Sequence, residues 1–171
     1  MAKSKSAPKS EIAPEIAESQ LASFIAKFTP EVASLAVEIR AKMRERYPTA
    51  LELVYDNYNA LAIGYAPAER TSEAIFSIAL YPRWVSLFFL QANRGLPDPE
   101  NRLRGSGNVA RHIVLPSAAA LDDPAVLALM EEAAARAKVL FDAKGKHRLI
   151  IKSISEKQRP RTPEGTESTA R

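Results

Sequence analysis

The sequence predicts an α+β protein, a two-layer sandwich in which N- and C-terminal helices pack on a mainly antiparallel sheet of five or six strands. Residues 51–91 carry the main signal, because they are rich in Val, Ile, Leu, Tyr and Phe and are broken by turn-forming residues. Segments with helical periodicity precede and follow this stretch. Strands clustered between helices are typical of the α+β class.

Two helices are expected before the sheet. Residues 1–11 are rich in Lys and Ser and should form a disordered tail, so that a single domain spans residues 12–154. Apolar residues at helical spacing predict the first helix over residues 15–28. Thr29, Pro30 and Glu31 then supply an N-cap, a proline at the first helical position and an acid near the positive helix end. They predict a second helix, which ends before Pro48 and packs on the sheet.

Four strands are predicted over residues 51–55, 60–65, 73–80 and 84–91, joined by turns into a meander. A half-solvated sheet should alternate apolar and polar residues, but the third and fourth strands are apolar on both faces. We therefore expect the second face of the sheet to be covered by the first helix or the C-terminal segment, to pack on another subunit, or to line a ligand pocket.

The remaining elements follow a long connection. Asp98, Pro99 and Glu100 predict a short helix that ends at Gly105, and residues 109–115 predict a fifth strand. Asp123 and Pro124 then open a last helix over residues 125–143, capped by Gly145. Residues 148–154 alternate enough to form a sixth strand. Residues 155–171 are polar and basic, and we expect them to form a mobile tail.

Composition narrows the function. The chain has no cysteine, which excludes disulfides, thiolate metal sites and a cysteine nucleophile. It has two histidines, and neither has a second histidine at ligand spacing, which disfavours zinc. No apolar run is long enough for a membrane span and no secretory signal is evident, so a cytoplasmic protein without a membrane partner is expected. Nucleophile elbows, Walker loops and Rossmann glycines are absent, so we expect no enzyme, and no cofactor is indicated.

The net charge of +4 is unevenly distributed. Residues 141–171 carry eight basic and four acidic side chains, whereas the rest of the chain is balanced. The basic character thus belongs to the C-terminal tail, which is either a solvated element or a site for an anionic partner. Nucleic acid is not expected as a partner.

The strongest candidate site is an anion loop. Consecutive backbone N–H groups in a glycine turn, flanked by arginines, can cradle a phosphate or carboxylate. A helix cap followed by an ordinary turn would explain the same residues without a ligand. Aromatic residues of the sheet offer a stacking surface for a flat ligand, or simply belong to the core. The candidate ligand-binding residues are Arg102, Arg104, Gly105, Ser106, Gly107, Arg111, Tyr58 and Trp84.

A candidate cation site lies on the second helix. Glu31, Glu38 and Glu45 are spaced by seven residues and share one flank, where they could bind a hard cation through oxygen. Basic residues are interleaved with them, so the alternative is an exposed face of salt bridges.

The stretch from about 24 to 138 resembles the YdhG-like bacterial domain family, whose function is unassigned. The resemblance is carried by the runs RYPTA at 46–50 and LELVYD at 51–56, the block at 81–88, the GSG at 105–107 before Arg111, and DDP at 122–124. Some members of that family are labelled frataxin-like intracellular iron chaperones. The resemblance thus implies the same fold and an iron-binding role for carboxylates on the helix face.

Three functions are therefore considered. The leading one is a non-enzymatic binding domain that holds a small anionic or aromatic ligand between the 102–111 loop and the strand ends near Tyr58. The first alternative is an iron-binding chaperone. The second is an interaction protein that forms a homodimer through the second sheet face or docks its basic tail on an acidic surface.

Overall fold

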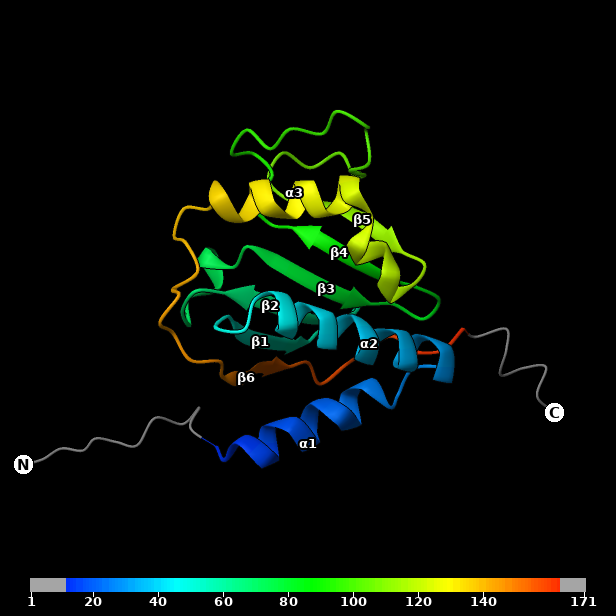
Figure 1. Cartoon of the computed structure of the whole chain (residues 1–171). Helices are drawn as coiled ribbons and strands as arrows, with labels where there is room; N and C mark the ends of the chain where they lie inside the picture. The colour runs from blue at the N-terminus through cyan, green and yellow to red at the C-terminus, as the bar shows by residue number, and fades with distance from the viewer. Residues whose placement is uncertain (1–11, 164–171) are drawn as a thin grey trace, which may run out of the picture.

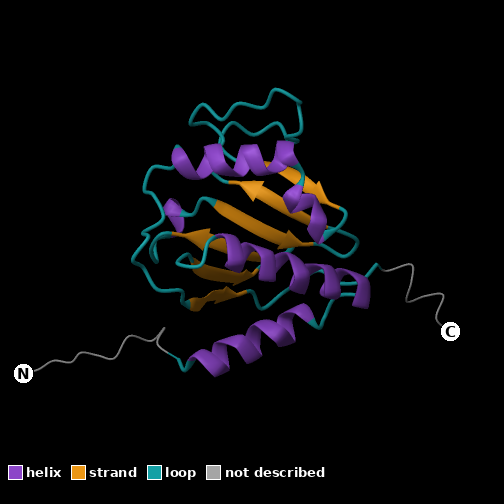
Figure 2. Ribbon diagram, viewed as in Figure 1, coloured by secondary structure: helices purple, strands orange, loops and turns teal. Residues whose placement is uncertain are grey.

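The computed structural model describes residues 12–163, in which one six-stranded sheet is covered by helices (Figure 1; Figure 2). This confirms the predicted α+β architecture and the mainly antiparallel sheet. The tail expected at residues 1–11 lies outside the described residues, as do residues 164–171. Over the described range, no helix combines the length and apolar character needed to cross a bilayer.

Three α-helices form the helical layer: α1 (Pro14–Ile25), α2 (Pro30–Arg46) and α3 (Pro124–Ala135), with two 3-10 turns, η1 (Thr71–Glu73) and η2 (Ala118–Asp122). The predicted start of α2 is confirmed, since the Thr29 hydroxyl accepts a hydrogen bond from the Val32 N–H at 3.2 Å. Asp123 caps α3 in the same way through the Ala125 N–H at 2.9 Å. Each of the three helices begins with a proline. Proline is favoured there because it has no N–H, and an N–H at the first helical position would lack an acceptor within the helix.

The sheet has the strand order β5-β4-β3-β2-β1-β6. Its strands are β1 (Leu51–Asp56), β2 (Leu61–Ala66), β3 (Phe76–Leu80), β4 (Val85–Phe89), β5 (Arg111–Leu115) and β6 (Leu149–Ile154). Neighbours from β1 to β5 are antiparallel, which confirms the meander. The last strand pairs with β1 in parallel, so the chain returns to the far edge of the sheet after α3.

The main core lies between the helices and one face of the sheet. Apolar residues of all three helices pack there against alternate residues of the strands, among them Ile63, Ile78 and Leu87, which are fully buried. Figure 1 shows α2 and α3 lying across this face, with α1 beside β6. The stripe predicted for α2 is confirmed: its buried residues are Val32, Ala36, Ile39 and Met43.

The second face of the sheet carries small apolar patches instead of a helical layer. The loop that contains η1 covers one part, where Leu51, Leu53, Ala66, Ala74 and Ile150 form a separate small core. The first helix does not cover this face, because its buried residues Leu21, Phe24 and Ile25 belong to the main core. Cover by the first helix is thus excluded, whereas cover by the C-terminal segment, a second subunit and a ligand remain, and Ser155 of that segment does line part of this face.

The last helix is shorter than predicted. It was expected to run to residue 143, but α3 ends at Ala135. Beyond it the chain is held by side chains of other segments: Gln91 accepts from the Lys138 N–H at 2.8 Å, and Arg94 donates to the Arg136 carbonyl at 2.6 Å. The Phe141 ring also lies 5.0 Å from that of Tyr47. These contacts override the helical propensity of the alanine-rich sequence.

The short helix predicted after Asp98 is wrong as well. The Asp98 carboxylate accepts from the N–H groups of Arg102 and Leu103 at 2.8 and 2.9 Å, so it caps a loop. Asn101 has a φ of 56°, a left-handed conformation that ends any helical turn there.

The fold extends beyond the expected boundary at Ile154. Residues 155–163 were expected to be part of a mobile tail, but the Ser155 and Arg159 N–H groups bond to the carbonyls of Asp56 and Tyr58 at 2.9 Å. Arg161 is only 6% exposed. The segment is fixed because its arginine finds a buried carboxylate, which a pattern of polar residues does not indicate.

Candidate functional site

In the predicted anion loop, residues 102–111, two of the three arginines already have partners within the protein. Arg102 pairs with Glu100 at 3.5 Å and with Asp123 at 3.2 Å. Arg111 donates to the carbonyls of Leu103 and Arg104. Gly105 has a φ of 102° and lies against His112, while Ser106 and Gly107 are exposed. Two of the three arginines thus hold the loop together.

Tyr58 and Trp84 lie at the other end of the sheet from this loop. The strand register pairs Phe89 with Arg111 at one end and Val85 with Leu115 at the other. The four steps from Val85 to Phe89 separate the two ends by roughly 13 Å. The two groups of residues therefore lie at opposite ends of these strands, and the expected ligand site between the loop and Tyr58 is not formed as one compact pocket.

The carboxylates of α2 are exposed and lie apart from its cations. Glu31, Glu38 and Glu45 point into solvent, and in the described part of the chain no group of three or more metal-ligating side chains is close enough to hold an ion. The interleaved basic residues pair instead with other elements: Lys42 and Arg46 both contact Asp122, at 2.6 and 2.8 Å. The iron site thus stays a prediction based on the resemblance alone.

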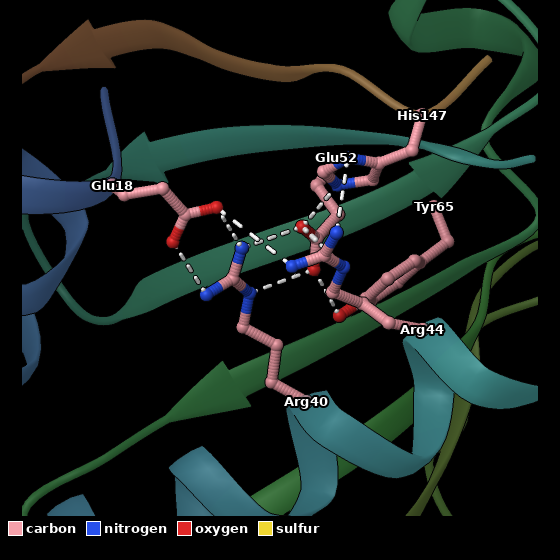
Figure 3. A network of polar contacts seen from close by, with 6 residues as sticks. All are labelled: Glu18, Arg40, Arg44, Glu52, Tyr65 and His147. Carbon is pink, nitrogen blue, oxygen red and sulfur yellow. Dashed lines mark hydrogen bonds and ion pairs between the residues drawn. The ribbon is translucent and has the colours of Figure 1, made fainter. Parts of the chain in front are cut away.

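A buried polar network occupies the start of β1 (Figure 3). Glu52 is fully buried, and its carboxylate accepts from both Nε and Nη2 of Arg40 at 2.9 and 2.8 Å and from the Tyr65 hydroxyl at 2.8 Å. Arg40 also donates two hydrogen bonds to Glu18 on α1, at 2.9 and 2.8 Å. One guanidinium therefore joins α1, α2 and β1.

His147 completes this network. Its Nε2 lies 2.7 Å from Glu52 Oε1 and its Nδ1 lies 3.3 Å from Arg44 Nη2. Arginine only donates and an ionised carboxylate only accepts, so a neutral His147 with its proton on Nε2 satisfies both contacts. This histidine precedes β6, and the network thereby also fixes the edge strand.

Burial and pairing act in opposite directions on the network's pKa values. Burial by itself would raise the pKa of Glu52, but hydrogen bonds from His147, Arg40 and Tyr65 hold it at about 2. Burial and the adjacent Glu52 charge raise the pKa of Tyr65 well above its ordinary value. The hydrogen bond from Arg40 lowers the pKa of Glu18. The carboxylates stay ionised at neutral pH, matched by the guanidiniums.

This network is closed rather than ready for a ligand. A cleft of about 430 Å³ lies on its solvent side, lined in part by Glu18, Arg44 and His147. Arg44, the more exposed of the two network arginines, already lies 3.8 Å from Glu18 and 4.0 Å from Glu52. Cations and carboxylates are thus matched within the protein, and we interpret the network as a structural junction.

A second buried carboxylate lies at the end of the same strand. Asp56 is fully buried; it accepts from Arg161 Nη2 at 2.8 Å and from Lys27 Nζ at 3.1 Å. Arg161 also donates to the Asn57 carbonyl at 2.6 Å and lies over the Phe28 ring. Burial would raise the pKa of Asp56, but contacts with Gln158, Lys27 and Arg161 lower it. This pair fastens the C-terminal segment to the sheet.

Next to this pair the surface is hollow. The β3–β4 connection places Tyr81 opposite Trp84, with the Tyr81 N–H donating to the Trp84 carbonyl at 2.9 Å. Their rings stack with centroids 5.1 Å apart and an interplanar angle of 27°. Between this connection and the C-terminal segment lies a hollow of about 720 Å³, lined by Asn59, Tyr81, Pro82, Arg83, Trp84, Arg159, Pro160, Thr162 and Pro163.

The hollow is open, aromatic and cationic. Trp84 is 42% exposed although it is a large aromatic residue. Arg83 and Arg159 are exposed, and neither side chain has an ion-pair partner within residues 12–163. The described lining contains no Asp or Glu. A stacking surface beside two guanidiniums matches a flat ligand that carries negative charge.

Sequence reasoning identified Trp84 but missed the two arginines. Arg83 was treated as part of a turn and Arg159 as part of a mobile tail. The sequence Arg159-Pro160-Arg161 is the one local feature that could have indicated a binding role for the C-terminal segment. The position of these residues depends on the pairing of Arg161 with Asp56, 105 residues away.

Comparisons with protein-family models, with curated proteins and with solved structures find no match to this chain. The resemblance to the YdhG-like family therefore remains a prediction, and the function is argued from the geometry.

Proposed function

We propose that the protein is a non-enzymatic binding domain for a small, flat, anionic ligand, held in the hollow between Trp84 and Arg159. The observation that supports it most is the exposed Tyr81–Trp84 stack, flanked by two arginines and no described carboxylate. Stacking favours an aromatic ring, and the guanidiniums favour a phosphate or carboxylate attached to it.

The size of the hollow agrees with this proposal. Its volume of about 720 Å³ lies within the range of roughly 300–1,000 Å³ that is typical of small-molecule sites. It is also built on rigid elements, since one wall is the β3–β4 connection and the other is anchored by the buried Arg161–Asp56 pair. A preformed wall lowers the entropic cost of binding.

The test uses Trp84, which is the sole tryptophan of the chain and therefore the sole indole reporter. The full chain is titrated with adenosine 5′-monophosphate, and in parallel with adenosine and with inorganic phosphate. We expect the nucleotide to change the fluorescence at lower concentration than either half alone, because only the nucleotide offers both a ring and a charge.

Charge variants then locate the site. Replacing both Arg83 and Arg159 with Gln should lower the affinity for the nucleotide by roughly tenfold or more and leave the affinity for adenosine unchanged. Arg70→Gln is the matched control, because Arg70 is exposed and lies outside the hollow. No response to any of the three probes, or equal weakening by the control, would contradict the proposal.

A further inference from the structure

The second face of the sheet continues the hollow along β4. Residues paired in an antiparallel ladder project to the same face, and side chains alternate along each strand. Val85, Leu87 and Phe89 are buried in the main core. Trp84, Ser86 and Phe88 therefore follow one another on the opposite face, where Trp84 is exposed, Phe88 is half-buried and Ser86 is buried.

A second aromatic pair lies on this face. Phe88 pairs with His112 across β4 and β5, and their rings lie 5.0 Å apart at 32°. Phe88 lies four positions after Trp84, which corresponds to roughly 13 Å along the strand. Two ring pairs thus lie on one surface. A small ligand bound at Trp84 would be too short to contact both pairs.

The surface between the aromatic groups is hollowed by small side chains. Ala60, Ala62, Ser77 and Ala79 belong to a depression of about 520 Å³, together with Tyr58, Phe88 and Leu90. This depression shares Asn59 and Tyr81 with the hollow at Trp84. The two form one continuous path across the sheet, and the described lining of the second also contains no Asp or Glu.

Positive charge follows the same path. Arg83 and Arg159 lie at the Trp84 end. At the other end, Arg104 pairs with His112 through an isolated antiparallel bridge, so its side chain projects to the same face. Burial lowers the pKa of His112, and the charge of the nearby Arg104 lowers it further. Arg104 forms no ion pair with any described residue.

We propose that this face binds single-stranded nucleic acid, with bases stacked on the Tyr81–Trp84 and Phe88–His112 pairs and phosphates near Arg83, Arg159 and Arg104. This inference rests on the proposed function, since it extends the same site. Open sheet faces with aromatic residues stack two or three unpaired bases in known recognition modes, and basic groups then follow the backbone. A duplex hides its bases and would lose the stacking contribution.

A second copy of the chain is a poorer occupant of this face. In a twofold dimer each copy would bring the same surface, whose described lining offers arginines and no carboxylate. Guanidiniums buried without partners oppose such an interface. A polyanion supplies the missing negative charge.

The experiment measures fluorescence anisotropy of labelled oligouridylates of about two, four and eight nucleotides on the full chain. We expect the affinity to rise with length and to exceed that of adenosine 5′-monophosphate. With three phosphate contacts, raising the salt from about 50 to about 200 mM should weaken binding roughly tenfold or more. A duplex of equal length should bind more weakly.

Two variants at the far end of the path separate this inference from the proposed function. Arg104→Gln and His112→Ala should each lower the affinity for the eight-nucleotide strand by at least about fivefold, yet leave the affinity for adenosine 5′-monophosphate unchanged. Arg70→Gln is again the control. Both side chains are partly or fully exposed, so the fold should tolerate their loss.

Each outcome discriminates. If the mononucleotide binds but longer strands bind no tighter, or if the two variants have no effect, the inference is wrong and the small-ligand function stands. Equal affinity for the duplex would also overturn it. If length-dependent binding occurs without measurable mononucleotide binding, the inference is supported and the small-ligand function is contradicted. If neither binds, both are wrong.

Discussion

The two ends of β1 bury the same chemical group for different purposes. Glu52 and Asp56 are both fully buried carboxylates paired with an arginine. The partners of Glu52 come from α2, β2 and the segment just before β6, and its partner Arg40 also binds Glu18 of α1, so this end ties together elements of the fold. The arginine on Asp56 comes from the C-terminal segment, and the surface next to it stays open.

This difference separates a structural junction from a candidate binding site. Burial and ion pairing alone do not distinguish the two ends of the strand. The distinguishing feature is the charge balance of the described residues: charges are matched around Glu52, whereas near Asp56 two arginines without an ion-pair partner in residues 12–163 lie beside the Tyr81–Trp84 stack.

The largest effect is expected at the Glu52 end. Glu52→Gln removes the buried charge that faces Arg40 and accepts from Tyr65 and His147. Breaking a buried pair on one side should lower the free energy of unfolding by about 3 kcal/mol, measured by urea denaturation. A loss below about 1 kcal/mol would contradict the structural role assigned to this network.

Acid should weaken the same end. The pKa of Glu52 is about 2 in the folded protein against an ordinary 4.5, so folding favours the ionised form. Its contribution is complete above about pH 5 and is lost as the pH falls through 4.5 toward 2. The shift corresponds to about 3 kcal/mol. Urea denaturation across this range should show a flatter pH dependence in Glu52→Gln; an identical slope would exclude Glu52 as the cause.

A smaller loss of stability is expected at the Asp56 end. Asp56→Asn removes the charge that pairs with Arg161. The C-terminal segment can then detach from the sheet, so that Arg161 becomes solvated instead of staying buried without a partner. The free energy of unfolding should fall by about 1–2 kcal/mol. Hydrogen exchange of residues 155–163 should rise far more than that of the sheet. Uniform acceleration across all strands would show that Asp56 supports the whole fold.

The smallest effect on stability is expected from Trp84→Ala. Trp84 is 42% exposed and its ring stacks on Tyr81 at the surface, so the free energy of unfolding should change by about 0.5 kcal/mol or less. Calorimetry should nevertheless show that nucleotide binding is weakened severalfold or lost. A large loss of stability would mean that Trp84 belongs to the core rather than to a site.

The sequence predicted the layout of the fold because its signals are local. Pro30 and Pro124 mark true helix starts, and the turn residues of 51–91 locate the four strands, although the third begins at Phe76 instead of residue 73 and the fourth ends at Phe89 instead of residue 91. The same locality explains the errors. Propensity extends the last helix past Ala135, whereas Gln91 and Phe141 redirect the chain there through contacts that no sequence window contains.

The candidate site was only partly predictable for the same reason. Trp84 was selected as one of the aromatic residues of the predicted sheet that could form a stacking surface. The sequence places Glu52 as an ordinary polar residue in a strand and Asp56 as a turn residue, because their partners His147 and Arg161 lie 95 and 105 residues away. The loop at 102–111 was selected for its composition, but the structure shows that Arg102 and Arg111 are held within the protein.

One comparison tests the central claim, that the Asp56 end carries the binding site and the Glu52 end does not. Binding of adenosine 5′-monophosphate is measured by calorimetry for the natural chain, Glu52→Gln and Asp56→Asn, at a temperature where circular dichroism shows all three to be folded. The account predicts equal affinity for the natural chain and Glu52→Gln, and a loss of at least about tenfold for Asp56→Asn. Unchanged binding in Asp56→Asn, or an equal loss in both variants, would contradict it.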